Sequence, residues 1–226
     1  MQRFFDIAFS SLALLILSPL MIPLVIILRF SGEGEIFYKQ NRVGINGESF
    51  GLLKFATMLK NSPNLNTGNM TVKNDPRILP LGSFLRKTKI NELPQLFNIF
   101  LGDMSIIGPR PLTQDHFDNY LPVIQQTILS VRPGLSGIGS IVFRDEEEIL
   151  HQHTDAKKFY KEYISSYKGS LEAWYVKNNC LLIYFALLFL TLWVVIFSKP
   201  KVVWKIFPSL PIPPAALEKV FSVDLT

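Results

Sequence analysis

The chain contains little cysteine and little charge. Its single cysteine, Cys180, excludes an internal disulfide framework and a zinc site built of cysteines, and it fits a reducing compartment. Charged residues make up only 18% of the 226 residues and hydrophobic residues 48%, and the mean hydropathy is +0.25. This composition is too apolar for an ordinary soluble domain. The apolar runs are nevertheless too interrupted for a channel with several membrane spans. The length predicts one medium domain with appendages, and two domains at most.

Acidic side chains are outnumbered by basic ones. The net charge is +5 and the isoelectric point is near 9.3, which suits a nucleic acid, an anionic lipid or a phosphorylated substrate. No basic helix, zinc-finger spacing or basic patch interleaved with aromatic residues occurs in the sequence. We therefore expect lipid or phosphate partners and no nucleic acid.

A long uncharged run lies near the N-terminus, from Ile7 to Leu28. As a helix it matches the ~30 Å thickness of a bilayer core, and a secretory signal is disfavoured because no small-residue cleavage site follows it. Pro19 and Pro23 interrupt the run, and Pro19 lacks the N–H that would bond the Leu15 carbonyl. In lipid, that carbonyl needs a local donor such as the hydroxyl of Ser18. The pattern favours a kinked or re-entrant helix, with a straight span as the alternative.

A second uncharged run covers Cys180 to Phe197 and is short for a membrane span. It would suit a helix on the membrane surface or a helix in the core, and we predict a membrane-associated helix. Between the runs, the sequence predicts a mixed α/β fold that is mostly helical, with short strands and amphipathic helices. The predicted strands are 35–38, 49–58 and 138–143, with a polar turn at 39–44. The predicted helices are 79–87, 113–131 and 156–174. The proline-rich segment after the second run is predicted to be loop-like.

The stretch from Lys87 to Leu112 is the richest in chemistry. It contains Glu92 and, between two prolines, Arg110. Apolar residues at helical spacing predict a short helix with one buried face and with Asn91 and Glu92 at its start. Helix N-termini bind phosphate through their free N–H groups. The apolar residues in question are Leu93, Leu96, Phe97 and Phe100.

Glu92 has an ordinary explanation, because carboxylates at helix starts are usually caps. Its basic neighbours in the sequence favour phosphate or metal chemistry instead. Arginines beside prolines usually brace loops, yet a pair of them in separate turns is better explained by phosphate oxygens. The basic side chains concerned are Arg86, Lys87, Lys89, Arg110 and Arg132.

The order of these motifs resembles that of the bacterial sugar transferases, the monotopic phosphoglycosyl transferases that act on polyprenyl phosphate. The resemblance covers about residues 3–200, nearly the whole chain. It is carried by Ser18-Pro19, Gln40-Asn41-Arg42-Val43-Gly44, Lys54-Phe55-Ala56-Thr57-Met58, Asp75-Pro76-Arg77, Asn91-Glu92-Leu93-Pro94-Gln95-Leu96, Gly102-Asp103-Met104-Ser105, Gly108-Pro109-Arg110-Pro111 and Arg132-Pro133-Gly134.

The resemblance implies transfer of sugar-1-phosphate from a UDP-sugar to undecaprenyl phosphate, with release of UMP and with Mg²⁺ as cofactor. Such a reaction initiates a surface glycan (O-antigen, capsule or exopolysaccharide) at the cytoplasmic face of the bacterial inner membrane. It also implies a re-entrant membrane helix at 1–30, a catalytic domain at 31–179, an apolar membrane-associated helix at 180–198 and a C-terminal tail at 199–226. The partners are then the UDP-sugar, undecaprenyl phosphate and membrane lipid, and a homo-oligomer is compatible with this assignment.

The resemblance also assigns roles to individual residues. Glu92 becomes the acid associated with the metal and the reaction. Ser18 and Pro19 form the break in the membrane helix. The remaining candidates grip substrate phosphate oxygens and are Lys54, Arg86, Arg110 and Arg132.

One position departs from the family pattern, since Asn91 stands where the family has a nucleophilic aspartate that forms a covalent phosphosugar intermediate. A carboxamide is not a useful nucleophile. Glu92 has taken over the attack, or transfer runs without a covalent intermediate, or the substitution disables the chain. We favour an active enzyme centred on Glu92. The alternatives are a catalytically silent membrane scaffold of the same pathway and a peripheral module that binds anionic lipid. Residues 135–140 also depart from the usual pattern, which leaves the sugar open.

Overall fold

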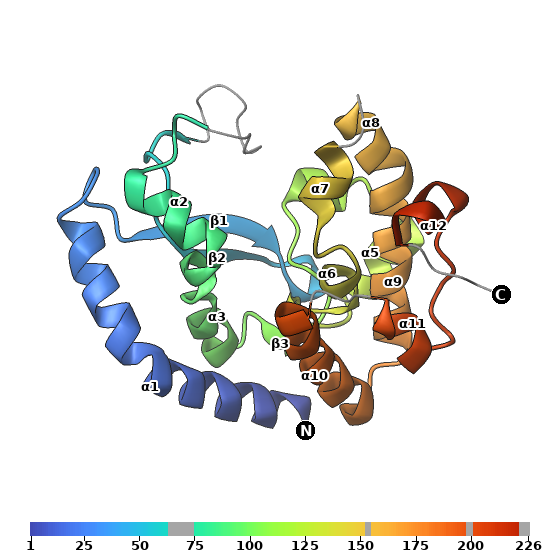
Figure 1. Ribbon diagram of the computed structural model, residues 1–226. Coiled ribbons are helices and arrows are strands. Elements are labelled where there is room, and N and C mark those ends of the chain that lie inside the picture. Colours follow the sequence, from blue (N-terminus) through green and yellow to red (C-terminus); the bar gives the residue numbers. More distant parts are fainter. Residues whose placement is uncertain (63–74, 152–154, 198–200, 222–226) are drawn as a thin grey trace. The chain divides into compact units, whose positions relative to one another are not determined.

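The computed structural model describes residues 1–62, 75–151, 155–197 and 201–221 (Figure 1). Helices dominate and the strands are short, which confirms the mixed, mostly helical fold predicted from the sequence. The α-helices are α1 Gln2–Arg29, α2 Pro80–Lys87, α3 Gln95–Leu101, α4 Gln114–Phe117, α5 Pro122–Ile128, α6 Ile138–Val142, α7 Glu146–His151, α8 Ala156–Phe159, α9 Ser165–Lys177, α10 Leu181–Phe197, α11 Val202–Ile206 and α12 Ala215–Phe221. The strands are β1 Phe37–Val43, β2 Ser49–Phe55, β3 Ser105–Ile107 and β4 Gly134–Ser136, and the short helical turns are η1 Ile45–Gly47, η3 Ile90–Glu92 and the π-helical η4 Tyr160–Ile164.

The chain forms two compact units. The first unit consists of Met1–Arg3, Arg42–Phe50 and Asp103–Thr226, and the second consists of Phe4–Asn41 and Gly51–Gly102. Strands β1 and β2 form a two-stranded sheet and contribute residues to both units. Their connection contains Asn46 and Gly47 at φ 57° and 82°, the left-handed backbone that an Asn-Gly hairpin turn requires.

Helix α1 remains helical through both prolines and bends partway along its length (Figure 1). The Ser18 hydroxyl donates a 2.8 Å hydrogen bond to the Leu15 carbonyl, the acceptor that Pro19 leaves without its usual N–H. The predicted kink and its local compensation are both confirmed. By length and composition, α1 is also able to cross a membrane.

The second unit has its core where the C-terminal half of α1 meets β2 and α2. Met21, Leu24 and Leu28 of α1 are buried together with Phe55 and Leu85. Most of the other large apolar side chains of α1 are exposed, including Leu12, Leu15, Ile16, Ile22 and Ile26. One stripe of α1 therefore belongs to the protein core, and the remainder is an apolar surface of the kind that lipid covers.

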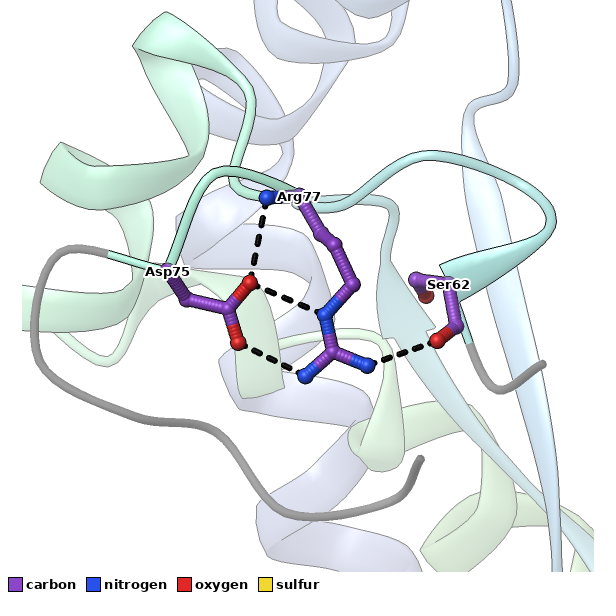
Figure 2. Close-up of polar contacts among 3 residues, drawn as sticks. All are labelled: Ser62, Asp75 and Arg77. Carbon is purple, nitrogen blue, oxygen red and sulfur yellow. Dashed lines mark hydrogen bonds and ion pairs between the residues drawn. The ribbon is translucent and has the colours of Figure 1, made fainter. Parts of the chain in front are cut away.

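A buried ion pair braces the segment that connects β2 with α2. Arg77 donates from Nη2 to Asp75 Oδ2 at 2.6 Å and from Nε to Asp75 Oδ1 at 2.9 Å, and its Nη1 donates to the Ser62 carbonyl at 2.7 Å (Figure 2). Both charged side chains are buried. Because every one of these contacts is internal, the Asp75-Pro76-Arg77 motif acts here as a structural brace.

The first unit is organised around a second two-stranded sheet. Strands β3 and β4 are parallel, with Ser105 opposite Gly134 and Ile107 opposite Ser136. Gly108 and Gly134 lie so close that a Cβ on Gly134 would be 2.1 Å from the Gly108 nitrogen. The segments that carry Arg110 and Arg132 flank this contact, so the sheet brings the two turns together.

The structure corrects three of the elements predicted between the two apolar runs. Residues 39–43 belong to strand β1 instead of a turn. The predicted helix 113–131 is split into α4 and α5, because Leu121 precedes Pro122 and adopts an extended backbone with ψ 142°. The predicted strand 138–143 is helix α6, with Ile138, Ile141 and Val142 all buried. A short run of buried β-branched residues does not distinguish a strand from a helix by periodicity.

Helix α10 begins at Leu181 and packs one face against α6 and β3 within the first unit. Tyr184, Leu187, Leu190 and Val194 are buried at helical spacing, and the Thr191 hydroxyl lies 2.8 Å from that of Ser136. Its other face exposes large apolar side chains, among them Leu182, Phe189, Leu192 and Ile196. The run therefore fills part of the core with one face and leaves a lipid-compatible surface on the other.

The C-terminal segment is more ordered than the predicted loop. It contains α11 and α12, and the Tyr167 hydroxyl of α9 donates to the Pro211 carbonyl at 2.7 Å. Trp174 of α9 donates from its indole N–H to the Ser209 hydroxyl at 3.2 Å. The prolines thus shape a segment that packs against α9. The predicted helix 156–174 is confirmed as the sequence α8, η4 and α9.

Candidate active site

Glu92 lies in a tight turn that precedes α3. Lys89 takes a left-handed backbone at φ 59°, and η3 follows directly, with the Glu92 N–H bonded to the Lys89 carbonyl at 3.0 Å. Helix α3 begins after Pro94, which occupies the N-cap position and has no side chain that could cap the helix. Glu92 lies two residues before this position, at the end of η3, so it is not the N-cap residue of α3.

Lys54 is the cation that the fold places beside Glu92. Their Nζ and Oε1 atoms are 3.7 Å apart, and both side chains are partly exposed. Asn98 of α3 explains this proximity, because its side chain accepts from the Leu53 N–H and donates to the Gly51 carbonyl, each at 2.9 Å. These two bonds fix β2 against α3, so the strand delivers Lys54 to the turn that carries Glu92.

Asn91 is buried beside Glu92, with 7% of its surface exposed. Its Oδ1 atom has no hydrogen-bond partner among the residues that the structure describes. An unsatisfied buried carbonyl costs about 1–3 kcal/mol and is uncommon outside functional sites. The carboxamide oxygen is thus an available acceptor or metal ligand next to the Glu92 carboxylate.

Arg86 joins this group through its helix. It lies in the last turn of α2, and α2 packs against η3. Lys54, Arg86, Asn91 and Glu92 all belong to the second unit. Three of the residues predicted from the sequence, Glu92, Lys54 and Arg86, therefore lie on elements that pack against one another. The other two predicted phosphate-binding cations do not belong to this group.

Arg110 and Arg132 belong to the first unit and form a second group. Both are exposed, and hydrogen bonds join the backbones of their turns: Ser105 N–H to the Pro133 carbonyl at 2.9 Å and Gly134 N–H to the Pro109 carbonyl at 2.8 Å. Two exposed guanidinium groups on adjacent rigid turns can bind phosphate oxygens. The prediction that they share a phosphate-binding role remains a prediction.

The donors around Glu92 fit a magnesium ion that is shared with a substrate. Mg²⁺ is commonly held by one or two protein oxygens together with water and substrate phosphates. Glu92 and Asn91 supply a carboxylate and a carboxamide oxygen. In the described parts of the chain, no three His, Cys, Asp or Glu side chains gather into a complete metal cage. The fit is to a metal–diphosphate complex and not to a structural ion.

A buried acid, Glu172, lies beside the turn that carries Arg110, and the sequence analysis did not predict it. Glu172 of α9 is 1% exposed, and its Oε1 accepts a hydrogen bond from the Arg110 N–H at 3.3 Å. Lys168, one turn earlier, is also buried and is paired with Glu146. The only sequence signal was a Lys and a Glu at helical spacing on an expected amphipathic helix, a pattern that is typical of exposed surfaces.

Glu172 gives the stability of the protein a specific pH dependence. Burial raises the pKa of this carboxyl from 4.5 to about 7, although the Arg110 N–H and the charges of Lys168 and Arg110 oppose the rise. Between these two pKa values the folded chain binds more protons than the unfolded chain, so the free energy of unfolding falls as pH rises and levels off above 7. The full effect is about 3 kcal/mol.

We expect thermal unfolding in detergent to show this fall between pH 5 and 8 in the unmodified chain. The Glu172→Gln variant should show a smaller fall, because it cannot titrate. The difference between the two curves reports the titration of Glu172 together with the effect of its charge on Lys168 and Tyr120. Two parallel curves would show that Glu172 titrates normally.

Comparison with known proteins gives a consistent assignment. A family model described as bacterial sugar transferase matches residues 1–198. The exopolysaccharide production protein ExoY of Rhizobium meliloti is 36% identical over 159 residues, which cover 64% of this chain and 70% of the relative. The undecaprenyl-phosphate galactose phosphotransferase of Salmonella typhimurium is 34% identical over 210 residues, or 87% of this chain and 40% of the relative.

A third relative is the UDP-glucose:undecaprenyl-phosphate glucose-1-phosphate transferase of Escherichia coli, 34% identical over 167 residues. The alignment covers 73% of this chain and 36% of that relative. The chain thus spans less than half the length of the two longer relatives and 70% of the ExoY protein. The region that the family model matches, residues 1–198, contains every site residue described above. The chain belongs to the bacterial sugar transferase family.

Proposed function

We propose that this chain transfers sugar-1-phosphate from a UDP-sugar to undecaprenyl phosphate, releases UMP and so initiates a surface glycan. Relatives whose names state such transfers support this proposal, as does the exopolysaccharide role in the name of ExoY. The observation that carries it is the Glu92 carboxylate, which is paired with Lys54 in a partly exposed turn of a family member.

The chemistry follows from the charges at this turn. In the transfer, the bond between the β-phosphorus and the bridging oxygen breaks, and UMP leaves with that oxygen while an incoming oxygen bonds the β-phosphorus. Lys54 and Arg86 stabilise the negative charge on the diphosphate by charge-assisted hydrogen bonds. Glu92 and Asn91 would hold Mg²⁺, which would neutralise phosphate charge and stabilise the leaving group. The incoming oxygen belongs directly to the lipid phosphate or to Glu92. In the second case the lipid phosphate then attacks the same phosphorus, the bond from phosphorus to the Glu92 oxygen breaks, and the carboxylate is restored.

A screen of UDP-sugars tests this function on purified chain in nanodiscs. We expect sustained UMP release from at least one UDP-sugar, and only when undecaprenyl phosphate is present. The matched control omits the lipid phosphate and contains the same nanodisc lipids. UMP release that ignores the acceptor would indicate hydrolysis and would contradict the proposal.

A silent scaffold is the second candidate, and Asn91 is the observation that favours it. The buried carboxamide occupies the position where the family pattern has an acid. A scaffold would bind UDP-sugar without releasing UMP. The same screen therefore separates the two candidates, provided that nucleotide-sugar binding is measured in parallel.

We also propose that α1 is re-entrant and that the protein lies on the cytoplasmic face of the inner membrane. The bend, the two prolines and the Ser18 bond to Leu15 support a helix that enters and leaves on one side. The exposed apolar face of α10 adds a second surface for lipid contact.

Labelling of a cysteine added before Met1 tests this topology, in a chain whose own Cys180 is replaced by serine. In intact cells stripped of their outer membrane, we expect no reaction with an impermeant maleimide, and full reaction after permeabilisation. The double variant Pro19→Ala, Pro23→Ala should straighten α1 and expose the added cysteine to the outside. Outside labelling of the parent chain would show a spanning helix.

A further inference from the structure

The first unit contains a buried charged cluster that the proposed reaction does not use. Lys168 and Glu172 lie one turn apart on α9 and are 5% and 1% exposed. Lys168 is paired with Glu146 of α7. Buried ion clusters seldom add stability over well-packed apolar side chains. This cluster therefore calls for an explanation other than stability.

Glu172 connects the cluster to the turn that carries Arg110. Its Oε1 accepts the Arg110 N–H at 3.3 Å, while its Oε2 has no hydrogen-bond partner in the described chain. The turn Gly108-Pro109-Arg110-Pro111 has only two N–H groups, because prolines have none. The Gly108 N–H bonds the Ser136 carbonyl at 2.9 Å. Glu172 thus satisfies the remaining donor of the turn.

Gly139 of α6 lies directly against the Glu172 carboxylate. A Cβ at position 139 would be 2.4 Å from Glu172 Oε1 and 3.2 Å from Lys168 Cγ. Only glycine leaves room for the side chains of α9 at this point. The carboxylate is therefore wedged between α6 and the turn, and a single methyl group at position 139 would displace it.

We propose that Glu172 is a positioning residue, which fixes the backbone of Arg110 so that its exposed guanidinium is presented to substrate phosphate in one direction. This inference rests on the proposed function for the part that concerns phosphate. A long exposed side chain is only as well placed as the backbone that carries it, and misplacement of such a group reduces the rate of transfer. Lys168, which is paired with Glu146 of α7, places a positive charge one turn from Glu172.

Hydrogen exchange tests the positioning directly and needs no activity. Peptides that include residues 108–112 report the amides of Gly108, Arg110 and Leu112 in this segment, since positions 109 and 111 are prolines. We expect exchange of the Arg110 amide to rise at least about 10-fold in Glu172→Ala and in Gly139→Ala. Glu172→Gln keeps an acceptor oxygen and should rescue most of the protection. The matched control is Ser166→Ala, on the exposed side of α9.

Steady-state kinetics then connects the turn to substrate. With the best UDP-sugar of the screen, Glu172→Ala and Gly139→Ala should raise KM by about 10-fold and change kcat less, because substrate grip is what loosens. In the Glu172→Ala background the Gly139→Ala change should add little, because the carboxylate that it would strike is gone. A purely structural role would instead give additive losses that follow the melting temperature.

Each outcome decides the inference. Unchanged Arg110 exchange in a folded Glu172→Ala protein would overturn it, as would a Gly139→Ala effect of equal size with and without the Glu172 carboxylate. If Glu172→Ala does not fold, Gly139→Ala alone decides the inference, because it displaces the carboxylate without removing it. Unchanged Arg110 exchange in a folded Gly139→Ala protein would then overturn the proposal. If the unmodified chain transfers no sugar, the exchange result still judges the positioning, and only the proposed function fails.

Discussion

Glu92→Gln is expected to reduce UMP release at least about 100-fold, the largest loss from any single substitution in this chain. The carboxamide keeps the size of the side chain, yet it removes the negative charge that would hold a metal and the carboxylate oxygen that would attack phosphorus. UMP release by the purified variant, with saturating UDP-sugar and undecaprenyl phosphate, measures the effect.

The fold should survive this substitution. The ion pair with Lys54 is partly exposed, and such pairs contribute at most about 1 kcal/mol. We expect the melting temperature of Glu92→Gln to stay within a few degrees of the parent, so that lost activity cannot be attributed to unfolding. Glu148→Gln, at an exposed position on α7, is the matched control. A Glu92→Gln enzyme that keeps a third of the parent rate would remove Glu92 from the chemistry.

Asn91→Asp is expected to raise UMP release by about 10-fold or more, because it supplies a carboxylate nucleophile beside Glu92. The replacement is nearly isosteric, because it puts an oxygen in place of the amide nitrogen. It also makes Oδ1, which is buried without a hydrogen-bond partner among the described residues, part of a carboxylate. The variant should also release up to one UMP per enzyme when the lipid acceptor is absent, as a covalent intermediate requires.

The unmodified chain makes this comparison informative. If it releases UMP in a burst without acceptor, Glu92 is the attacking group. If it needs the acceptor even for a first turnover, the lipid phosphate attacks directly. If only Asn91→Asp releases UMP, and the unmodified chain merely binds the nucleotide sugar, then the scaffold candidate is correct.

Local chemistry was the part of the fold that could be predicted from the sequence. The proline at position 19 removes a known N–H from a known carbonyl, and the neighbouring serine is the nearest donor, so the Ser18–Leu15 bond follows from covalent structure. The prediction that Phe97 and Phe100 lie on a buried helix face is wrong, because they are 40% and 44% exposed. Helical spacing identified an apolar stripe, but Asn98 and Ile99 occupy the buried face because Asn98 bonds β2.

Long-range packing explains the rest. The sequence placed Glu92 among basic residues, but it gave no reason for Lys54, on a distant strand, to be the one beside it. That proximity depends on the Asn98 clamp. Glu172 was missed for a similar reason, since a Lys–Glu pair on a helix is ordinarily exposed, and here tertiary packing against α6 and the Arg110 turn buries the glutamate.

Transfer of the β-phosphate of a UDP-sugar into the lipid phase is the most direct test of the central claim, that the chain moves sugar-1-phosphate at a site built on Glu92. The measurement uses UDP-sugar radiolabelled in its β-phosphate, unmodified chain in nanodiscs and undecaprenyl phosphate, followed by organic extraction. The account predicts that label enters the lipid fraction in step with UMP release, and that Glu92→Gln stops both. Lipid that stays unlabelled under every UDP-sugar tested, or labelling that persists in Glu92→Gln, would contradict it.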